Sequence, residues 1–361
     1  MGTRIAMNLM RGPVEKDYWT DPDADEIAVL VARIAAKSFE TCDPGTITKT
    51  AYQLPGLSLE VTGYDAETTR LLTGVFSHLE ISGEKDAALS WTIIRLAPGN
   101  EFSLPPAPMP LGRYGTLHRN PDNSVFVERR NGFTTVFWLD RWELVTVCHD
   151  LNAIDNDALA KPMLRILIGL LHKKGVVVAH AALLGGREYG MLITGKGGAG
   201  KSTISAAALD GGLSFAGDDF IAIEQREDGF YGHSLYGSVL LDATSSPAAQ
   251  PLRRTLRPAH SGFKAMIDVG QNFRPQLQRT LKIDAIAVPE ISAEPNSRLA
   301  LRSRGAIARA LMPTSIFASP WREPSRAATL FDMVANLPAY TYFSGAEFRS
   351  IAAPLRERYG Q

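Results

Sequence analysis

The sequence predicts an α/β domain with a mixed sheet in residues 151–361, preceded by an α+β domain in residues 1–150. Three observations lead to this prediction. A glycine-rich loop follows an apolar run and precedes a helix-prone run in the second half of the chain. Helical and strand-like runs are mixed around that loop, as in an α/β domain. The first half instead shows one helical run followed by short strands between turn signals.

The composition limits the classes of protein to which the chain can belong. Its 361 residues suffice for two domains, and 45% of them are apolar, as in a globular protein. The 38 basic residues equal the 38 acidic ones, so no general attraction to nucleic acid or to an anionic membrane is expected. No apolar run has the length of a signal-peptide core at the N-terminus or of a membrane span elsewhere. Two cysteines, Cys42 and Cys148, form no disulfide framework and no metal-ligand spacing, which favours a cytoplasmic location.

In the N-terminal domain, the apolar spacing of residues 26–38 predicts a helix. Strands are expected between turn signals, at residues 57–61, 89–96, 124–129 and 134–138. Residues 101–112, with four prolines, predict a loop or an extended linker. Cys148, His149 and Asp150 are adjacent, but neighbours on a strand point to opposite faces, which favours a structural role over a reactive cluster. This domain therefore carries no catalytic motif, and recognition of a substrate or partner is its expected role.

The second domain is expected to alternate between helices and strands. An amphipathic helix over 157–173 leads into an apolar strand over 175–184, and a second strand, 189–194, precedes the glycine-rich loop. After the loop we expect a helix at 202–209, a strand at 213–216 and a hairpin of 221–225 with 230–236, turned by Asp228-Gly229. Further along the chain we expect a strand at 283–288, a helix at 327–337, a strand at 340–343 and a helix at 346–358 that Pro354 kinks or divides.

The glycine-rich loop matches the pattern G-x-x-x-x-G-K-S and consists of Gly195, Lys196, Gly197, Gly198, Ala199, Gly200, Lys201, Ser202 and Thr203. Because glycine has no Cβ, several backbone N–H groups of such a loop can converge on a phosphate, and the positive end of the following helix adds to the attraction. Lys201 is expected to reach the β- and γ-phosphates and Ser202 to coordinate Mg²⁺, with Thr203 the less favoured ligand. The alternative is a tight turn without a ligand, but four glycines followed by Lys-Ser exceed what a turn requires.

Three further side chains are expected beside this loop. Asp218 and Asp219 directly follow a short apolar strand, 17 and 18 positions after Lys201, where the chain returns to the phosphates. One carboxylate can hold Mg²⁺ and the other can take the proton of an attacking hydroxyl, although a strand-end cap is the alternative. His180 lies 15 residues before Gly195 on the expected neighbouring strand, so it can orient an aspartate or bind a phosphate oxygen.

With these residues in place, the segment 162–225 resembles the catalytic domain of bacterial HPr kinase/phosphorylase and its shorter relatives. The resemblance rests on His180-Ala-Ala, Gly195-Lys-Gly-Gly-Ala-Gly-Lys-Ser and Gly217-Asp-Asp, which occur in that order at similar intervals. It implies a phosphate-loop kinase of the phosphoenolpyruvate-carboxykinase-like fold that uses ATP and Mg²⁺ to phosphorylate a serine hydroxyl.

By the same resemblance, Lys201 binds phosphate, Ser202 and Asp219 hold Mg²⁺, and Asp218 is the general base with His180 beside it. The chain also departs from that family, because Thr203 replaces the usual glutamate and no Glu-Ile-Arg-Gly-Leu-Gly segment follows the aspartate pair. The expected acceptor is therefore a serine of a peptide or protein other than HPr.

Two other interpretations of the loop remain open. An early lysine, Lys196, also fits the deviant loop of partition and septum-site ATPases, in which it reaches the nucleotide of a partner subunit. Those proteins usually carry the loop near the N-terminus, whereas some 190 residues precede it here. The third interpretation is a nucleotide-binding module without turnover.

A basic stretch between residues 251 and 282 is a further candidate for binding. It can provide an arginine for the transferring phosphate, receive an acidic peptide, or form a solvated surface. Its members are Arg253, Arg254, Arg257, Lys264, Arg274, Arg279 and Lys282. Sparse aromatic residues around these basic side chains argue against nucleic acid as a partner. The sequence leaves open whether the chain forms a homo-oligomer.

Overall fold

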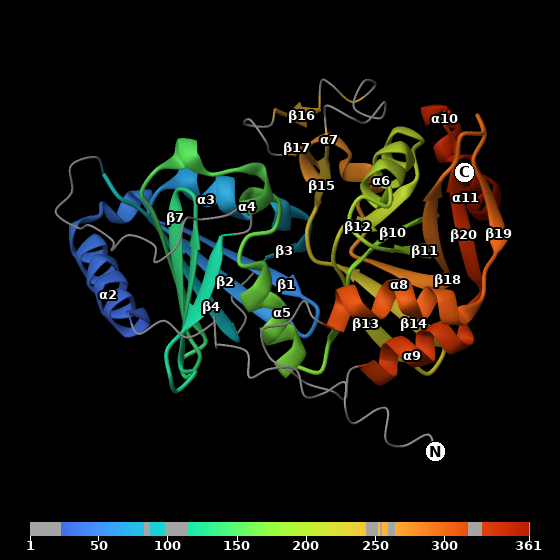
Figure 1. The fold of residues 1–361 in the computed structure, drawn as a ribbon. Coiled ribbons are helices and arrows are strands. Elements are labelled where there is room, and N and C mark those ends of the chain that lie inside the picture. The colour runs from blue at the N-terminus through green and yellow to red at the C-terminus, as the bar shows by residue number, and fades with distance from the viewer. Residues whose placement is uncertain are drawn as a thin grey trace, which may run out of the picture.

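The computed structural model describes residues 23–82, 87–97, 115–242, 252, 255–258, 264–316 and 327–360. Within these residues the protein is α/β and contains two large mixed sheets that lie side by side, together with a small three-stranded sheet (Figure 1). The first large sheet ends at Cys148 and the second begins at Val177, on either side of the boundary expected near residue 150. The expected linker at 101–112 lies outside the described residues.

The first large sheet has the strand order β3-β1-β2-β4-β8-β7-β6-β5. Its strands are β1 (Thr48–Leu54), β2 (Leu57–Gly63), β3 (Glu80–Ile81), β4 (Leu89–Arg95), β5 (Thr116–Arg119), β6 (Val125–Arg130), β7 (Phe133–Trp138) and β8 (Glu143–Cys148). These strands confirm the four predicted from the sequence. Every residue of β6 and β7 is buried, because both faces of this part of the sheet are covered.

Helix α2 (Ala24–Thr41) covers the outer face of the first sheet and confirms the helix predicted over 26–38 (Figure 1). Its buried residues recur at helical spacing and pack on Val127, Val136 and Val147. The opposite face packs against α3 (Ala66–Thr73) and α5 (Leu164–Lys173), in a core that continues into the second half of the chain.

The second large sheet has the order β12-β10-β11-β18-β14-β13-β9, with β20 beside the C-terminal part of β18 and β19 beside β20. Its strands are β9 (Val177–Ala179), β10 (Ala181–Gly185), β11 (Tyr189–Thr194), β12 (Ser214–Gly217), β13 (Ile221–Arg226), β14 (Gly229–Ser234), β18 (Thr280–Ile291), β19 (Arg298–Leu301) and β20 (Ala339–Ser344). Strands β11 and β18 are parallel and most other pairs are antiparallel, so the predicted mixed sheet and hairpin are confirmed.

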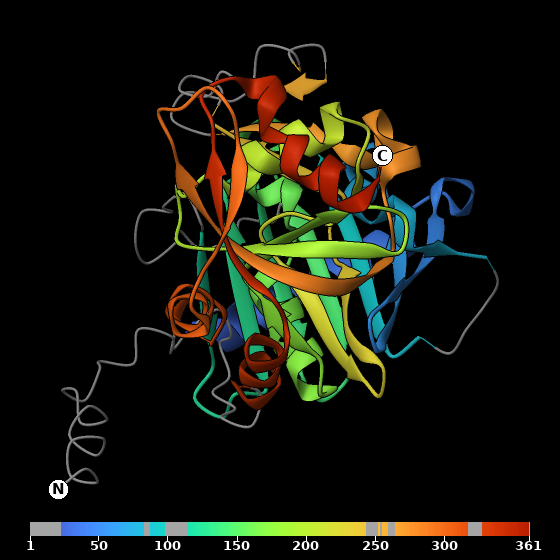
Figure 2. The ribbon, with the colours of Figure 1, turned by 90° about the vertical axis from the view of Figure 1, so that its right-hand side faces the viewer.

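Helices cover both faces of the second sheet. On one face lie α6 (Lys201–Asp210), α10 (Phe348–Ile351) and α11 (Ala353–Tyr359), and on the other lie α8 (Arg304–Ile316) and α9 (Ala327–Asn336) (Figure 2). The break between α10 and α11 precedes Pro354, as predicted. Beside α6 lie the strands of the small sheet, β15 (Ser238–Leu241), β16 (Leu256–Arg257) and β17 (Ala265–Asp268), followed by the short helix α7 (Val269–Asn272).

One prediction was wrong in a way that affects the candidate site. The helix expected over 157–173 is divided into α4 (Asn156–Ala160) and α5, because proline removes a backbone N–H and disfavours helical dihedrals in the residue before it. Lys161, directly before Pro162, has φ −146° and ψ 62°, and Met163 after it has φ 47°. The chain therefore turns sharply at Lys161 instead of carrying it along a continuous helix.

The apolar strand expected over 175–184 is likewise interrupted, at His180. The part before it, β9, pairs with β13, whereas the part after it, β10, pairs with β11 and β12. Because only one residue separates β9 from β10, His180 joins one end of the strand order, β9, to β10, the strand next to the other end. This closure brings His180 next to the turn between β12 and β13.

One of the hydrophobic cores of the protein joins the two large sheets. Phe76 contacts Trp91 of the first sheet and Tyr236, which follows β14 of the second, with ring centroids 6.5 and 5.3 Å apart. Polar ties reinforce this contact, since Arg279 Nε donates to the His78 carbonyl at 2.7 Å. The first half of the chain is thus packed directly against the half that carries the glycine-rich loop.

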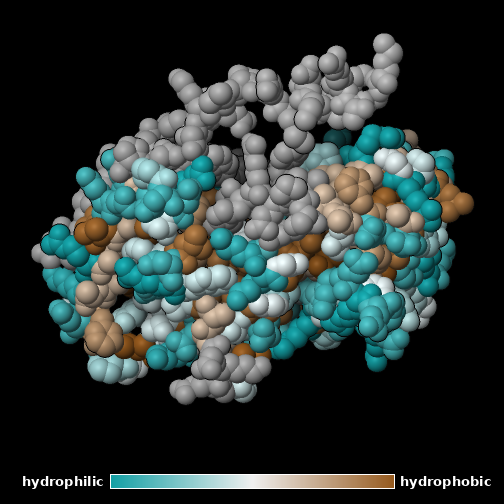
Figure 3. All heavy atoms as spheres, turned by 90° about the horizontal axis from the view of Figure 1, so that it is seen from below, coloured by the Kyte–Doolittle hydropathy of each residue, from teal (hydrophilic) through white to brown (hydrophobic). Residues whose placement is uncertain are grey.

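Apolar and polar side chains are interspersed on the face shown in Figure 3. The large apolar side chains that are exposed are Val29 and Phe39 of α2 and, from four other elements, Tyr189, Ile291, Leu301 and Phe331. Among the described helices, none combines the length and the apolar character needed to cross a bilayer.

Candidate functional site

The glycine-rich loop connects β11 to α6, and its backbone faces open space. Gly198 and Gly200 have φ of 79° and 103°, values that favour glycine because a Cβ would strain the backbone there. A Cβ placed on Gly197, Gly198 or Gly200 would meet no atom within 4 Å. A loop of this shape ahead of the first N–H groups of a ten-residue helix is suited to an anion.

Lys201 begins α6 and folds back over the loop. Its side chain is buried, and Nζ donates to the carbonyl oxygens of Gly195 at 2.8 Å and Lys196 at 3.4 Å. Burial lowers the pKa of Lys201, against the opposing effect of Asp219 and Asp218. The side chain of Lys196 is exposed, so the two lysines of the loop lie in different environments.

Asp218 follows β12 and lies against the first turn of α6. Its carboxylate accepts hydrogen bonds from Ser202 Oγ at 2.7 Å and from Ser205 Oγ at 3.1 Å. Ser202 and Ser205 are three positions apart and therefore lie on the same face of the helix. Burial raises the pKa of Asp218, and the charge of Asp219 raises it further, against the lowering effect of these hydroxyl donors.

Asp219 is turned away from α6 by its backbone. Its φ of 71° is left-handed, which is uncommon for a residue with a side chain but tolerated by aspartate. The carboxylate contacts Lys161 Nζ through Oδ2 at 2.6 Å and His180 Nε2 through Oδ1 at 3.2 Å. Burial acts to raise the pKa of Asp219, but Lys161 and His180 outweigh it and hold this pKa well below its usual range.

An aromatic ring supports this second group. Phe220 stacks on His180 with ring centroids 5.2 Å apart and an interplanar angle of 22°. Lys161 Nζ lies 5.9 Å from the centroid of the Phe220 ring, within range of a cation–π contact. The Phe220 ring therefore contacts both partners of Asp219.

The structure brings together every catalytic and metal-ligating residue named from the sequence, but in a different pairing. We expected His180 beside Asp218 and Ser202 beside Asp219, whereas His180 contacts Asp219 and Ser202 contacts Asp218. Asp218 also accepts a hydrogen bond from Ser205 on α6.

Two contacts of the aspartate pair, with Ser205 and with Lys161, were not predicted from the sequence. Ser205 repeats Ser202 at a spacing of three on the loop helix, and that spacing was the available signal. Lys161 precedes a proline within an otherwise helical pattern. The proline predicts a break in the helix, but it does not predict which residue the Lys161 side chain contacts. Its partner, Asp219, is 58 residues away in sequence.

The residues present fit a magnesium ion only in combination with a ligand. The described residues contain no cluster of three or more His, Cys, Asp or Glu side chains able to hold a metal. Ser202 and Asp218 supply two hard oxygen donors that already lie 2.7 Å apart. Mg²⁺ typically takes one or two protein oxygens and completes its shell with phosphate and water, so this pair suits a phosphate-bound Mg²⁺.

Much of the basic stretch is engaged in the structure or lies outside it. Arg253 and Arg254 are not among the described residues. Arg279 donates to carbonyls of the first half of the chain, and Lys282 pairs with Asp228 at 2.8 Å. Arg279 thus ties the two halves together, and Lys282 forms a surface ion pair.

Cys148, His149 and Asp150 take structural places, as expected. Cys148 is fully buried in the core, and burial followed by the charge of Asp65 raises its pKa to about 12. Asp150 accepts a hydrogen bond from Asn152 N at 2.9 Å and caps the turn that follows. Cys148 is therefore buried, whereas His149 and Asp150 are exposed, so the three side chains lie in different surroundings.

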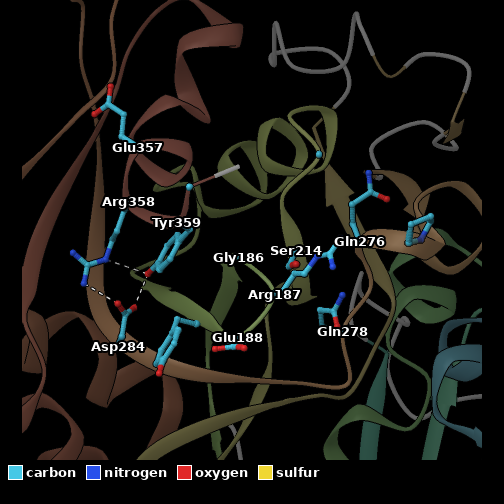
Figure 4. A pocket seen from close by; sticks show the side chains of 14 residues that line it. Gly186, Arg187, Glu188, Ser214, Gln276, Gln278, Asp284, Glu357, Arg358 and Tyr359 are labelled. Atoms are coloured by element: carbon cyan, nitrogen blue, oxygen red, sulfur yellow. Dashed lines mark hydrogen bonds and ion pairs between the residues drawn. The ribbon is translucent and has the colours of Figure 1, made fainter.

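A cavity of about 1230 Å³ is shown in Figure 4, and none of its lining residues belongs to the glycine-rich loop. The turn between β10 and β11 lines it, at the start of β11, whereas the glycine-rich loop begins at the other end of this strand. On its wall Asp284 accepts hydrogen bonds from Arg358 and Tyr359 (Figure 4). This cavity is therefore separate from the group around Asp218 and Asp219.

Comparison with known proteins gives only weak likeness, and only to solved structures. No family model matches the chain, and no curated protein matches it. Among solved structures, the HPr(Ser) kinase/phosphatase from Coxiella burnetii matches 44% of this chain and 94% of its own, with 19% identity and a TM-score of 0.24. Because its TM-score is below 0.5, this likeness does not establish a shared fold. The chain is an α/β protein with large mixed sheets.

Proposed function

We propose that the chain is a kinase that uses ATP and Mg²⁺ to phosphorylate a hydroxyl, namely a serine of a peptide or protein other than HPr. The observation that carries the proposal is the opposite surroundings of two adjacent carboxylates beside the glycine-rich loop. Asp218 contacts Ser202 on the loop helix, while Asp219 contacts Lys161 and His180. Carboxylate pairs whose pKa values are pushed apart are typical of sites that divide two chemical roles between them.

The first role is to bind the nucleotide. The loop N–H groups and Lys201 bind the β- and γ-phosphates, and Ser202 with Asp218 holds Mg²⁺, which reverses the assignment of the aspartates expected from the sequence. Lys201 exchanges its contacts with the Gly195 and Lys196 carbonyls for phosphate oxygens. When bound, Mg²⁺ offsets negative charge on the phosphates and so lowers the barrier to transfer.

The second role is to receive the proton. The acceptor oxygen forms a bond to the γ-phosphorus, the bond from that phosphorus to the bridging oxygen breaks, and ADP leaves with the bonding electrons. The hydroxyl proton passes to the Asp219 carboxylate. His180, held by Phe220 and by its contact with Asp219, keeps that carboxylate oriented.

Calorimetric binding of ATP with Mg²⁺ to wild type, Lys201→Ala and Lys49→Ala tests this proposal. Lys49 is an exposed lysine on β1 and serves as a matched control. We expect Lys201→Ala to lose at least about tenfold in affinity, or roughly 1.4 kcal/mol, and Lys49→Ala to bind as wild type does. Failure of wild type to bind ATP would contradict the proposal, and binding without phosphate transfer to any acceptor would leave a nucleotide-binding module.

The exposure of Lys196 favours a second candidate, an ATPase switch that dimerises on ATP. A lysine that binds the nucleotide of a partner subunit has to extend into solvent from its own subunit. The Lys196 side chain is exposed and meets this condition. This candidate predicts ATP-dependent dimerisation that fails in Lys196→Ala, measured by light scattering. The kinase proposal predicts that the same variant keeps phosphate transfer.

A further inference from the structure

Lys161 makes the shortest polar contact to the aspartate pair. Its Nζ lies 2.6 Å from Asp219 Oδ2, and its side chain is only 11% exposed. Lysine is rarely buried unless its charge is paired, so the contact with Asp219 accounts for its presence here. The ammonium group is held in one place on one oxygen of this carboxylate.

The backbone on both sides of Lys161 is fixed by side chains that follow β14. The carbonyl of Ala160 accepts a hydrogen bond from Ser238 Oγ at 2.8 Å, and that of Pro162 accepts one from Tyr236 Oη at 2.9 Å. The break between α4 and α5 is therefore anchored rather than loose. A functional group supported in this way is preorganised before any substrate arrives.

The contacts divide the two oxygens of Asp219. Lys161 engages Oδ2 at 2.6 Å, whereas His180 engages Oδ1 at the longer distance of 3.2 Å. Because Lys161 fixes one oxygen and Phe220 fixes the His180 ring, the carboxylate has little freedom to rotate. Oδ1 accepts only the longer contact, from His180 at 3.2 Å, so less of its capacity to accept hydrogen bonds is used than at Oδ2.

We propose that Lys161 is a positioning residue for phosphate transfer, which holds Asp219 so that Oδ1 faces the acceptor hydroxyl. This inference rests on the proposed kinase function. In the step described above, the acceptor proton goes to Asp219 Oδ1 as its oxygen bonds to the γ-phosphorus and ADP leaves. Lys161 keeps its own protons throughout and acts only through Asp219.

The experiment measures release of the γ-phosphate of ATP to water, in MgCl₂, by wild type, Lys161→Ala, Lys161→Arg and Lys282→Ala. Lys282 is the matched control, because it forms an ion pair of 2.8 Å with Asp228 and lies beside Tyr189, at the end of β11 remote from the loop. Loss of a positioned proton acceptor typically costs about 100-fold or more in rate, so we expect that loss in kcat for Lys161→Ala, with KM for ATP within about twofold. Lys161→Arg retains a cation and should recover at least about tenfold over Lys161→Ala.

Chemical rescue separates positioning from a merely structural role. Propylamine supplied to Lys161→Ala should raise kcat, because it returns an ammonium donor to the space that the side chain left. Tetramethylammonium has the same charge but no N–H donor, and should not. Calorimetric ATP affinity and the melting temperature of each variant are measured alongside, and Lys161→Met replaces Lys161→Ala if the latter does not fold.

The outcomes distinguish the two proposals. No phosphate release from ATP by wild type, either to water or to serine peptides, would overturn the kinase function itself. Wild-type release together with an unchanged kcat in Lys161→Ala would overturn the Lys161 inference alone. A loss of activity that appears only in KM, or that neither arginine nor propylamine restores, would also overturn it.

Discussion

Replacement of Gly200 by alanine tests whether the loop backbone is held in the conformation that an anion requires. Gly200 has φ 103°, and no atom lies within 4 Å of the place where a Cβ would stand, so the cost is one of backbone strain alone. Such strain costs about 1–3 kcal/mol. For cooperative unfolding of 361 residues the unfolding entropy is about 0.8 kcal/mol per kelvin, so we expect Tm to fall by about 1–4 °C.

The control is Gly197→Ala in the same loop. Gly197 has equally open surroundings but is not among the residues with positive φ. Alanine there should stabilise by about 0.4–1 kcal/mol, because it restricts the unfolded chain. Differential scanning calorimetry measures both Tm values, and calorimetric ATP titration should show the larger loss of affinity in Gly200→Ala. Equal shifts in Tm for the two variants would refute the reasoning.

Three further predictions concern buried groups. Burial and the neighbouring Asp219 raise the pKa of Asp218, so ionisation of this carboxyl group destabilises the folded state. At pH 8 without Mg²⁺, the melting temperature of Asp218→Asn should therefore exceed that of wild type. The difference should vanish as pH falls toward about 4, where the carboxyl group of Asp218 becomes protonated in both states. Burial, with help from nearby arginines, lowers the pKa of His78 to about 3, so the unfolded chain binds its proton first on acidification. The contribution of neutral His78 to the free energy of unfolding is complete above pH 6.5 and falls by up to about 1.4 kcal/mol per pH unit below it. Urea titrations of His78→Gln at several pH values should lack this slope. Finally, Cys42 is only partly buried and should react with Ellman's reagent in the native protein. Cys148 should react only after unfolding, because burial raises the pKa of its thiol to about 12.

The parts of the site that depend on local sequence were predictable. The glycine-rich loop, its helix and the strands on either side follow from turn chemistry and apolar spacing, which act over a few residues. The nearness of His180 to that loop followed from the expected hairpin of the two strands before it, in which Ala181 pairs with Thr194. The aspartate pair was expected there because it follows the strand that returns from the loop helix. The structure bears out each of these local expectations.

The pairing inside the site was not predictable, because it depends on two irregular features of the backbone. The left-handed φ of Asp219 turns its side chain away from that of Asp218, and sequence alone gives no sign of this. The break at Pro162 sends Lys161 to an aspartate distant in sequence, and its direction is set by contacts with Ser238 and Tyr236. Packing between segments far apart in the chain decides such details.

The central claim is that the two adjacent aspartates have different roles, and calorimetric ATP titration of Asp218→Asn and Asp219→Asn, with and without Mg²⁺, tests it most directly. We expect Asp218→Asn to bind ATP with little response to Mg²⁺, because the oxygen that would share the ion with Ser202 is replaced. Asp219→Asn should keep the Mg²⁺ response of wild type while losing phosphate release. Loss of the Mg²⁺ response in Asp219→Asn but not in Asp218→Asn would contradict the account.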